Sequence, residues 1–264
     1  MEIYVSTMKR IKGLTAVINF RVFIVTITTL VAFYFCYKYK LKLFVDFNVI
    51  SIAIVFPLVF TITGAYQKRQ DALRLLSDYR ANLVGISDYF KTVYKMPEEN
   101  IKKFNSLLSS VSKSLYEMLT NNSKKTTIED IREIMKDIHG VIYENMSRFN
   151  EREKDSLIGS KREISRCIEN LNALNIHGTP SSLRSYCLFF IYIFPFIYVP
   201  ALFNHSFVEV TLTNQVIIMI LSVLISFVLM ALYNIQLYIE NPFDQEGLDD
   251  IKTEIFKIED KEIT

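Results

Sequence analysis

The sequence FNVISIAIVFPLVFTITG (residues 47–64) runs directly into AYQKRQDALRLLSDYR (residues 65–80). The first part is uncharged and apolar, as expected of a membrane-spanning helix, whereas the second part carries charged residues in a helical pattern. No turn signal separates the two parts. The sequence therefore predicts one helix that leaves the lipid and enters water, joining a membrane region to a large soluble region.

Composition and length indicate an integral membrane protein. The chain has 264 residues, of which 50% are hydrophobic, with 20 Phe, 15 Tyr and no Trp. Its net charge of +2 gives no overall basic field, so we expect no nucleic-acid partner. The three cysteines are far apart and odd in number, which favours reduced packing residues over disulfides or a zinc site.

Four segments are long and apolar enough to cross a bilayer: residues 16–37, 44–64, 186–203 and 216–233. The first is longer than a signal-peptide core and lacks a small-residue cleavage site before Lys38, so we expect it to be retained. Its Arg21 lies near the helix end, where an arginine side chain can reach the interface; a role in an ion path is the alternative.

The distribution of basic residues predicts the orientation of these spans. The loop 204–215 contains no Lys or Arg, while basic residues flank the inner ends of the second and third spans: Lys68, Arg69, Arg74 and Arg184. The positive-inside rule then places both termini and the central region in the cytoplasm. Lys38, Lys40 and Lys42 fall outside, against the rule, and we keep the topology because the long basic region outweighs three lysines.

The predicted fold class is all-α: an integral membrane protein with four transmembrane helices and a long helical cytosolic bundle between spans two and three. The expected divisions are spans one and two (1–64), the cytosolic helical region (65–185), spans three and four (186–239) and an acidic cytosolic tail (240–264). The cytosolic region should hold a helix that starts near Pro97 and another with a capping box at Thr127 and Asp130. The tail has nine acids and three lysines, which favours packing on the basic region.

Signals of enzymatic chemistry are weak. His139, His177 and His205 are isolated, no glycine-rich phosphate loop or nucleophile motif is present, and the chain holds only seven glycines. We therefore predict that the protein is not an enzyme. The acidic segment 241–250 could supply oxygen ligands for calcium, but its spacing differs from that of a helix-loop-helix calcium loop, and a solvated turn is the alternative.

Ile52, Phe56 and Phe60 recur at steps of four residues in the second span, so they project from one face of the helix. If several copies of this helix surrounded an axis, the three side chains would form stacked apolar rings, which can gate ions by dewetting. The alternative is ordinary packing, because any apolar span contains such a series.

Two short motifs indicate a resemblance to a known family. The first is Ile239-Glu-Asn-Pro-Phe243, followed by acids, and the second consists of Phe60, Tyr66 and Arg69. They resemble the asparagine-proline-phenylalanine turn after the last membrane helix and the pattern at the inner end of the pore helix in the bestrophins, a family of pentameric ion channels. The order of spans, the long cytoplasmic insert and the acidic tail also agree, so the resemblance covers nearly the whole chain.

The resemblance implies roles for particular residues. Phe60 matches the innermost phenylalanine of the family's pore neck, which places Phe56 and Ile52 at the other two neck positions. In calcium-gated members the acidic turn helps to clasp a calcium ion, and the matching positions here are Asn241, Glu246 and Asp249. Gln245 stands where an acid is expected, and Asp244 replaces the usual glycine. These two departures weaken the case for calcium as a cofactor.

Our leading hypothesis is a bestrophin-like channel, a homopentamer in the lipid bilayer, with passive flux of chloride-like anions through an axial pore with an apolar neck. Lys38, Lys40 and Lys42 would concentrate inorganic anions at the external mouth. The alternative is a membrane-anchored signalling or scaffold protein whose helical cytosolic domain binds a partner. Oligomeric geometry separates the two hypotheses.

Overall fold

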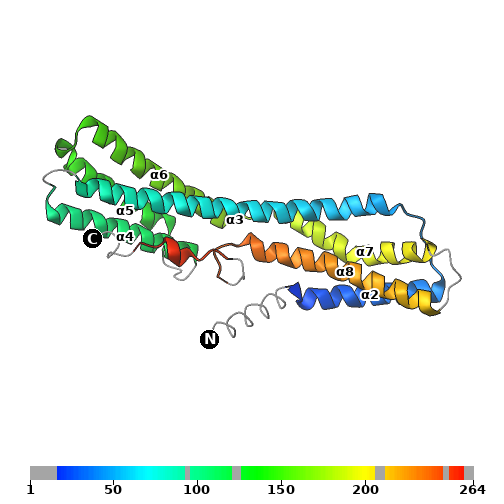
Figure 1. Cartoon of the computed structure of the whole chain (residues 1–264). Helices are drawn as coiled ribbons and strands as arrows, with labels where there is room; N and C mark the ends of the chain where they lie inside the picture. Colours follow the sequence, from blue (N-terminus) through cyan, green and yellow to red (C-terminus); the bar gives the residue numbers. More distant parts are fainter. Residues whose placement is uncertain (1–16, 93–95, 121–125, 206–211, 246–249, 259–264) are drawn as a thin grey trace. The chain divides into compact units, whose positions relative to one another are not determined.

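The computed structural model describes residues 17–92, 96–120, 126–205, 212–245 and 250–258, and these contain helices and no strand. Figure 1 shows α2 (Phe20–Tyr39), α3 (Phe47–Thr92), α4 (Glu98–Leu119), α5 (Ile128–Glu144), α6 (Glu151–Ile176), α7 (Ser181–His205) and α8 (Leu212–Glu240). Two short 3-10 helices cover Met146–Arg148 and Thr253–Phe256. The predicted all-α class is confirmed.

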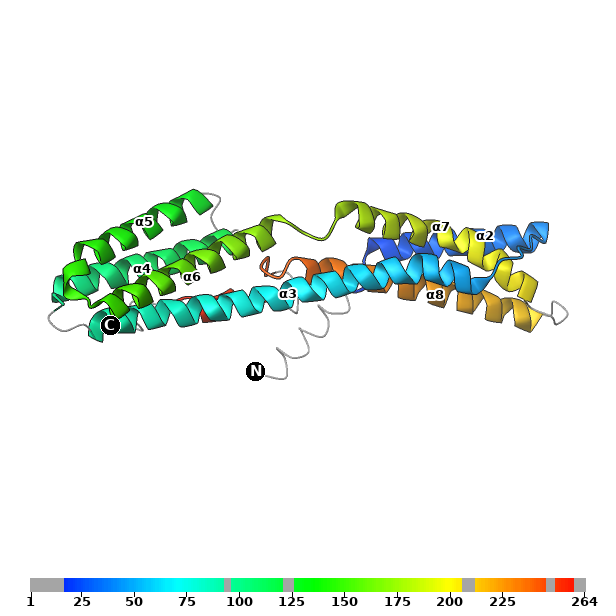
Figure 2. The ribbon, with the colours of Figure 1, turned by 90° about the horizontal axis from the view of Figure 1, so that it is seen from above.

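The chain divides into two compact units. The apolar unit holds the described residues up to Gln67 together with those from Gly178 to Glu240, and the bundle unit holds the described residues from Lys68 to His177 and those of the tail from Asn241 onwards. Helix α3 contributes to both units and runs without a break, as Figures 1 and 2 show. The single helix predicted across residues 47–80 is therefore confirmed.

In the apolar unit, α2 packs against α7 and α8, and α7 packs against α8. The first part of α3 joins them through Ile54 and Leu58, which lie in the same buried cluster as Val25, Ile191 and Met230. Buried hydroxyls of α2 and α8 pair across the two helices, since the Thr29 Oγ1 hydroxyl donates to Ser226 Oγ at 2.9 Å.

Three helical segments among the described residues are long and apolar enough to cross a membrane: Phe20–Tyr39, Glu151–Asn204, which includes α7, and Leu212–Glu240. The apolar part of α3 is the remaining span predicted from the sequence. The total of four spans stays a prediction.

The bundle unit is built from the second part of α3 together with α4, α5 and α6 around an apolar core. The rings of Phe90 and Phe104 stack with centroids 4.1 Å apart and join α3 to α4. Helix α4 begins at Glu98 after Pro97, and Thr127 and Asp130 form a reciprocal capping box at the start of α5. Both predicted helix starts are confirmed. They could be predicted from sequence because capping depends on residues only a few positions apart.

The described part of the acidic tail packs on the bundle core, as its charge, opposite to that of the basic region, led us to expect. The contacts are mainly apolar, since Phe243, Ile251 and Ile258 are each at most 2% exposed within that core. The backbone N–H of Ile258 donates to Ser112 Oγ at 2.9 Å. Burial of these apolar side chains thus anchors the described part of the tail.

The three cysteines, Cys36, Cys167 and Cys187, are all buried and free. The prediction of reduced packing residues is confirmed.

Candidate functional site

The apolar face of α3 predicted to line a pore is not covered by any residue that the structure describes. Ile52, Phe56 and Phe60 are 58%, 56% and 64% exposed, whereas Ile54 and Leu58 on the opposite side are buried. The rings of Phe56 and Phe60 lie with centroids 6.1 Å apart. The first part of α3 therefore turns one apolar side to its own unit, while its second apolar side has no partner among the described residues.

This exposed face continues into uncharged polar residues. Thr63, Gln67 and Gln70 are exposed and follow Phe60 at helical spacing, so they lie on the same side of α3. The sequence reasoning missed them, although their spacing from Phe60 was the available signal. An apolar section followed by hydroxyl and amide groups differs from a purely lipid-facing stripe, and it suits a path along which an ion regains water.

A proline interrupts the hydrogen bonds of α3 beside the same face. Pro57 has no N–H to donate to the carbonyl of Ala53, four residues earlier in the helix. The Tyr186 hydroxyl of α7 donates to that carbonyl at 3.2 Å. Tyr186 therefore satisfies the acceptor that Pro57 leaves free, which matters because unpaired backbone groups are costly in lipid.

The three lysines predicted outside the membrane gather at one cavity. A cavity of about 570 Å³ is lined by Cys36, Tyr37, Lys38, Lys40, Leu41, Lys42, Phe203 and Gln215. These residues come from the end of α2 and the segment after it, the end of α7 and the start of α8. The structure thus adds a hollow, also lined by the buried Cys36 and Phe203, to what the sequence showed only as a run of alternating lysines.

Arg21, for which interface contact and an ion path were the alternatives, lies with its guanidinium 5.8 Å from the ring centroid of Tyr233. Its Nη1 atom is buried and has no hydrogen-bond partner. This cation–π contact holds the side chain at the N-terminal end of α2.

The end of α8 carries a buried carboxylate that sequence reasoning did not single out. Glu240 Oε1 accepts from the Thr179 N–H at 3.0 Å and from Thr179 Oγ1 at 2.8 Å, and Oε2 accepts from Arg184 at 2.8 Å and from Gln236 at 3.2 Å. The Glu240 side chain is only 3% exposed. We call this set the Glu240 clasp, because it ties the end of α8 to the start of α7.

The candidate calcium residues follow directly after the Glu240 clasp. Asn241 is exposed, whereas Glu246 and Asp249 lie outside the described residues. Gln245, with a φ of 61°, donates its amide to the Ile251 carbonyl at 2.8 Å. In the part of the chain that the structure describes, no group of three or more His, Cys, Asp or Glu side chains could hold a metal ion.

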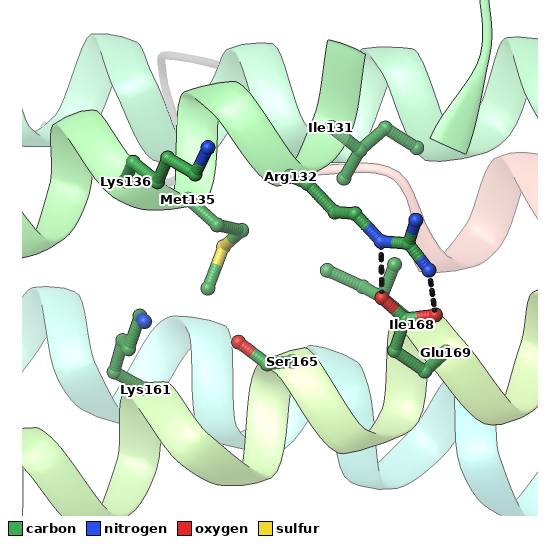
Figure 3. A pocket seen from close by; sticks show the side chains of 8 residues that line it. All are labelled: Ile131, Arg132, Met135, Lys136, Lys161, Ser165, Ile168 and Glu169. Carbon is green, nitrogen blue, oxygen red and sulfur yellow. Dashed lines mark hydrogen bonds and ion pairs between the residues drawn. The ribbon is translucent and has the colours of Figure 1, made fainter. Parts of the chain in front are cut away.

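A smaller cavity of about 170 Å³ lies between α5 and α6 in the bundle unit (Figure 3). Arg132 and Glu169 close one end of it with two hydrogen bonds of 2.7 and 2.8 Å, and Lys136, Lys161 and Ser165 line the remainder. The hydrogen bonds from Arg132 lower the pKa of the Glu169 carboxyl. The ion pair joins α5 to α6, and no predicted site residue lies here.

No protein-family model and no curated protein sequence matches the chain. The fold, however, is shared with solved structures. A crystal structure of a bacterial bestrophin homologue from Klebsiella pneumoniae aligns with a TM-score of 0.70 and 15% identity, over 92% of this chain and 94% of that chain. A point variant of the same homologue aligns with a TM-score of 0.71 and 16% identity, over 92% and 96%.

At these identities the likeness shows the fold. The chain has a bestrophin-like fold over nearly its whole length, so the resemblance inferred from two short motifs is confirmed at that level. Together with its long apolar helices, the shared fold supports an integral membrane protein.

Proposed function

Because the chain shares its fold with a bacterial bestrophin homologue, we propose that it is an oligomeric ion channel whose α3 helices surround an axial pore. The assembly would be a homopentamer with four spans per chain, with both termini and the bundle unit in the cytoplasm. The observation that carries this proposal is the uncovered face of α3, where three large apolar side chains lead into Thr63, Gln67 and Gln70.

Ile52, Phe56 and Phe60 would form the neck. Rings of such side chains from several subunits would narrow the path to an apolar constriction, through which ions pass only when water fills it. Truncating these side chains would widen the neck and ease its wetting.

The transported ion would be a small inorganic anion. Lys38, Lys40 and Lys42 would raise the local anion concentration at the external mouth, an effect that added salt would screen. We propose passive flux, with a chloride-like anion as the favoured substrate.

Flux through purified protein in liposomes tests the neck. Ile52→Ala, Phe56→Ala and Phe60→Ala should each raise anion flux several-fold, because a wider constriction is easier to wet. Matched controls are Ile27→Ala and Phe23→Ala on α2, whose side chains are 60% and 59% exposed but belong to another helix. Flux that is indifferent to the three α3 variants, or equally sensitive to the α2 variants, would remove the neck assignment.

A further inference from the structure

The end of α2 holds a lysine in a backbone conformation that usually belongs to glycine. Lys40 has φ 50° and ψ 40°, and its backbone N–H donates to the Cys36 carbonyl, which ends the helix. A left-handed residue at this position is most often glycine, because a Cβ atom there crowds the following carbonyl oxygen. Backbone strain at a residue other than glycine often marks a functional site.

The backbone around Lys40 directs the lysines to one place. Leu41 N–H donates to the Cys36 carbonyl at 3.1 Å, and Leu43 N–H donates to the Pro200 carbonyl of α7 at 3.2 Å. These bonds fix the segment after α2 against the end of α7. Lys38, Lys40 and Lys42 thereby line the same 570 Å³ cavity, which we call the lysine cavity.

The described lining of the lysine cavity carries positive charge alone. Among the lining residues that the structure describes, three are lysines and none is acidic. None of the ion pairs between described residues involves these lysines, and Lys38 instead lies 5.7 and 5.6 Å from the ring centroids of Tyr34 and Tyr39. Ammonium groups placed close together repel one another, so an anion bound among them is stabilised.

The shape of the lysine cavity selects among anions. Its volume is far larger than a single halide needs and is that of a small-molecule site, about 300–1,000 Å³. Two of its lining residues, Cys36 and Phe203, are buried, and we call them its floor; Lys38, Lys40 and Lys42 are exposed. A ligand with several anionic oxygens at one end and carbon at the other fits this division.

The position of the cavity suggests where such a ligand comes from. It lies where α2 and α7 end and α8 begins, and each of these lies in a segment apolar enough to span a membrane. Lysine and tyrosine at the end of a span sit at the level of the lipid headgroups. At that level the anionic groups within reach of lysine side chains are the phosphoryl groups of lipids.

We propose that the lysine cavity binds a glycerol-linked phosphoryl anion, either the headgroup of an anionic glycerophospholipid or the free phosphomonoester of the same chemistry. Lys38, Lys40 and Lys42 hold the phosphoryl oxygens, and the floor contacts the carbon chain. Because its test measures binding and not flux, the proposal stands or falls separately from the channel.

Native mass spectrometry of the full-length protein in detergent tests the site, with phosphatidylglycerol, phosphatidylcholine and glycerol phosphate as separate probes. Phosphatidylglycerol should bind more tightly than phosphatidylcholine. The triple variant Lys38→Gln, Lys40→Gln, Lys42→Gln should weaken binding about 100-fold, since each lysine near an anionic headgroup contributes about 1 kcal/mol. The matched control replaces three exposed lysines of α4 and should leave binding unchanged: Lys102→Gln, Lys103→Gln and Lys113→Gln.

A second variant separates lost charge from lost folding. Lys40→Gly removes one charge and suits the left-handed backbone, so it should fold at least as well as the wild type while weakening binding about fivefold. Binding of phosphatidylglycerol without binding of glycerol phosphate identifies the lipid as the ligand, and the reverse identifies the soluble ester. If Lys40→Gly and the triple variant bind both probes as the wild type does, the proposal is wrong.

Discussion

Pro57 removes one backbone donor from α3, and Tyr186 supplies another in its place. The Tyr186 hydroxyl donates to the Ala53 carbonyl across 133 positions of sequence. Length and apolar composition placed Pro57 in a predicted span, but no pattern in one segment can name a partner in another. This contact lies one turn from Phe56 and fixes the backbone on which the proposed neck is mounted.

Tyr186→Phe should lower the free energy of unfolding by about 1 kcal/mol, because the Ala53 carbonyl loses its donor. In a Pro57→Ala background the cost should shrink, since the new backbone N–H can donate to that carbonyl within the helix. Thermal unfolding of the four proteins in detergent gives the coupling free energy. Equal costs of Tyr186→Phe in both backgrounds would show that the hydroxyl does not replace the missing donor.

Gly178 lies too close to Glu240 to carry a side chain. A Cβ atom there would lie 2.6 Å from Glu240 Oε1, an oxygen held by two hydrogen bonds from Thr179. Gly178→Ala should therefore displace the Glu240 carboxylate and cost about 2 kcal/mol of stability, as overpacking commonly does.

Gly159→Ala is the matched control for Gly178→Ala. Gly159 lies inside α6, and a Cβ there would meet nothing within 4 Å. This substitution should stabilise the protein by up to about 1 kcal/mol through helix propensity. If thermal unfolding shows the two glycine variants to be alike, crowding against Glu240 is not the reason for Gly178.

At the scale of elements, local rules predicted the helices well. The unbroken α3, the start of α4 and the capping box of α5 all depend on neighbours within a few residues. The Glu240 clasp could not be predicted, because Thr179 and Glu240 are 61 positions apart. The anchoring of the tail was expected from charge, and the structure adds buried apolar side chains of the tail that the charge pattern did not indicate.

The capping box of α5 makes the stability of the bundle unit depend on pH. Hydrogen bonds from the Thr127 backbone and side chain lower the pKa of the Asp130 carboxyl. A lowered folded-state pKa contributes stability above the ordinary carboxyl pKa of about 4, and this contribution is lost as the pH falls through the folded-state value.

Asp130→Asn removes this titration while keeping an oxygen that can accept from Thr127. The variant should therefore be less stable than the wild type at neutral pH, and the difference should narrow below about pH 4. Thermal unfolding between neutral and acidic pH measures this difference in stability. Asp137→Asn of the same helix is the control for lost charge. A difference that is constant across this range would contradict the assigned titration.

At the scale of the whole molecule, sequence reasoning identified the fold through two short motifs and the order of the spans. It also proposed Ile52, Phe56 and Phe60, which the structure leaves uncovered on one face of α3. It could not find the lysine cavity, because a hollow depends on how the ends of three helices meet. A single chain also cannot show what covers the face of α3, and that question separates the channel from a membrane-anchored scaffold.

Single-particle imaging of the purified protein in lipid nanodiscs tests the central claim most directly. We predict a ring of five chains with α3 nearest the axis and the side chains of Ile52, Phe56 and Phe60 facing an open path. A monomer or dimer in which Phe56 is buried between helices would contradict the account.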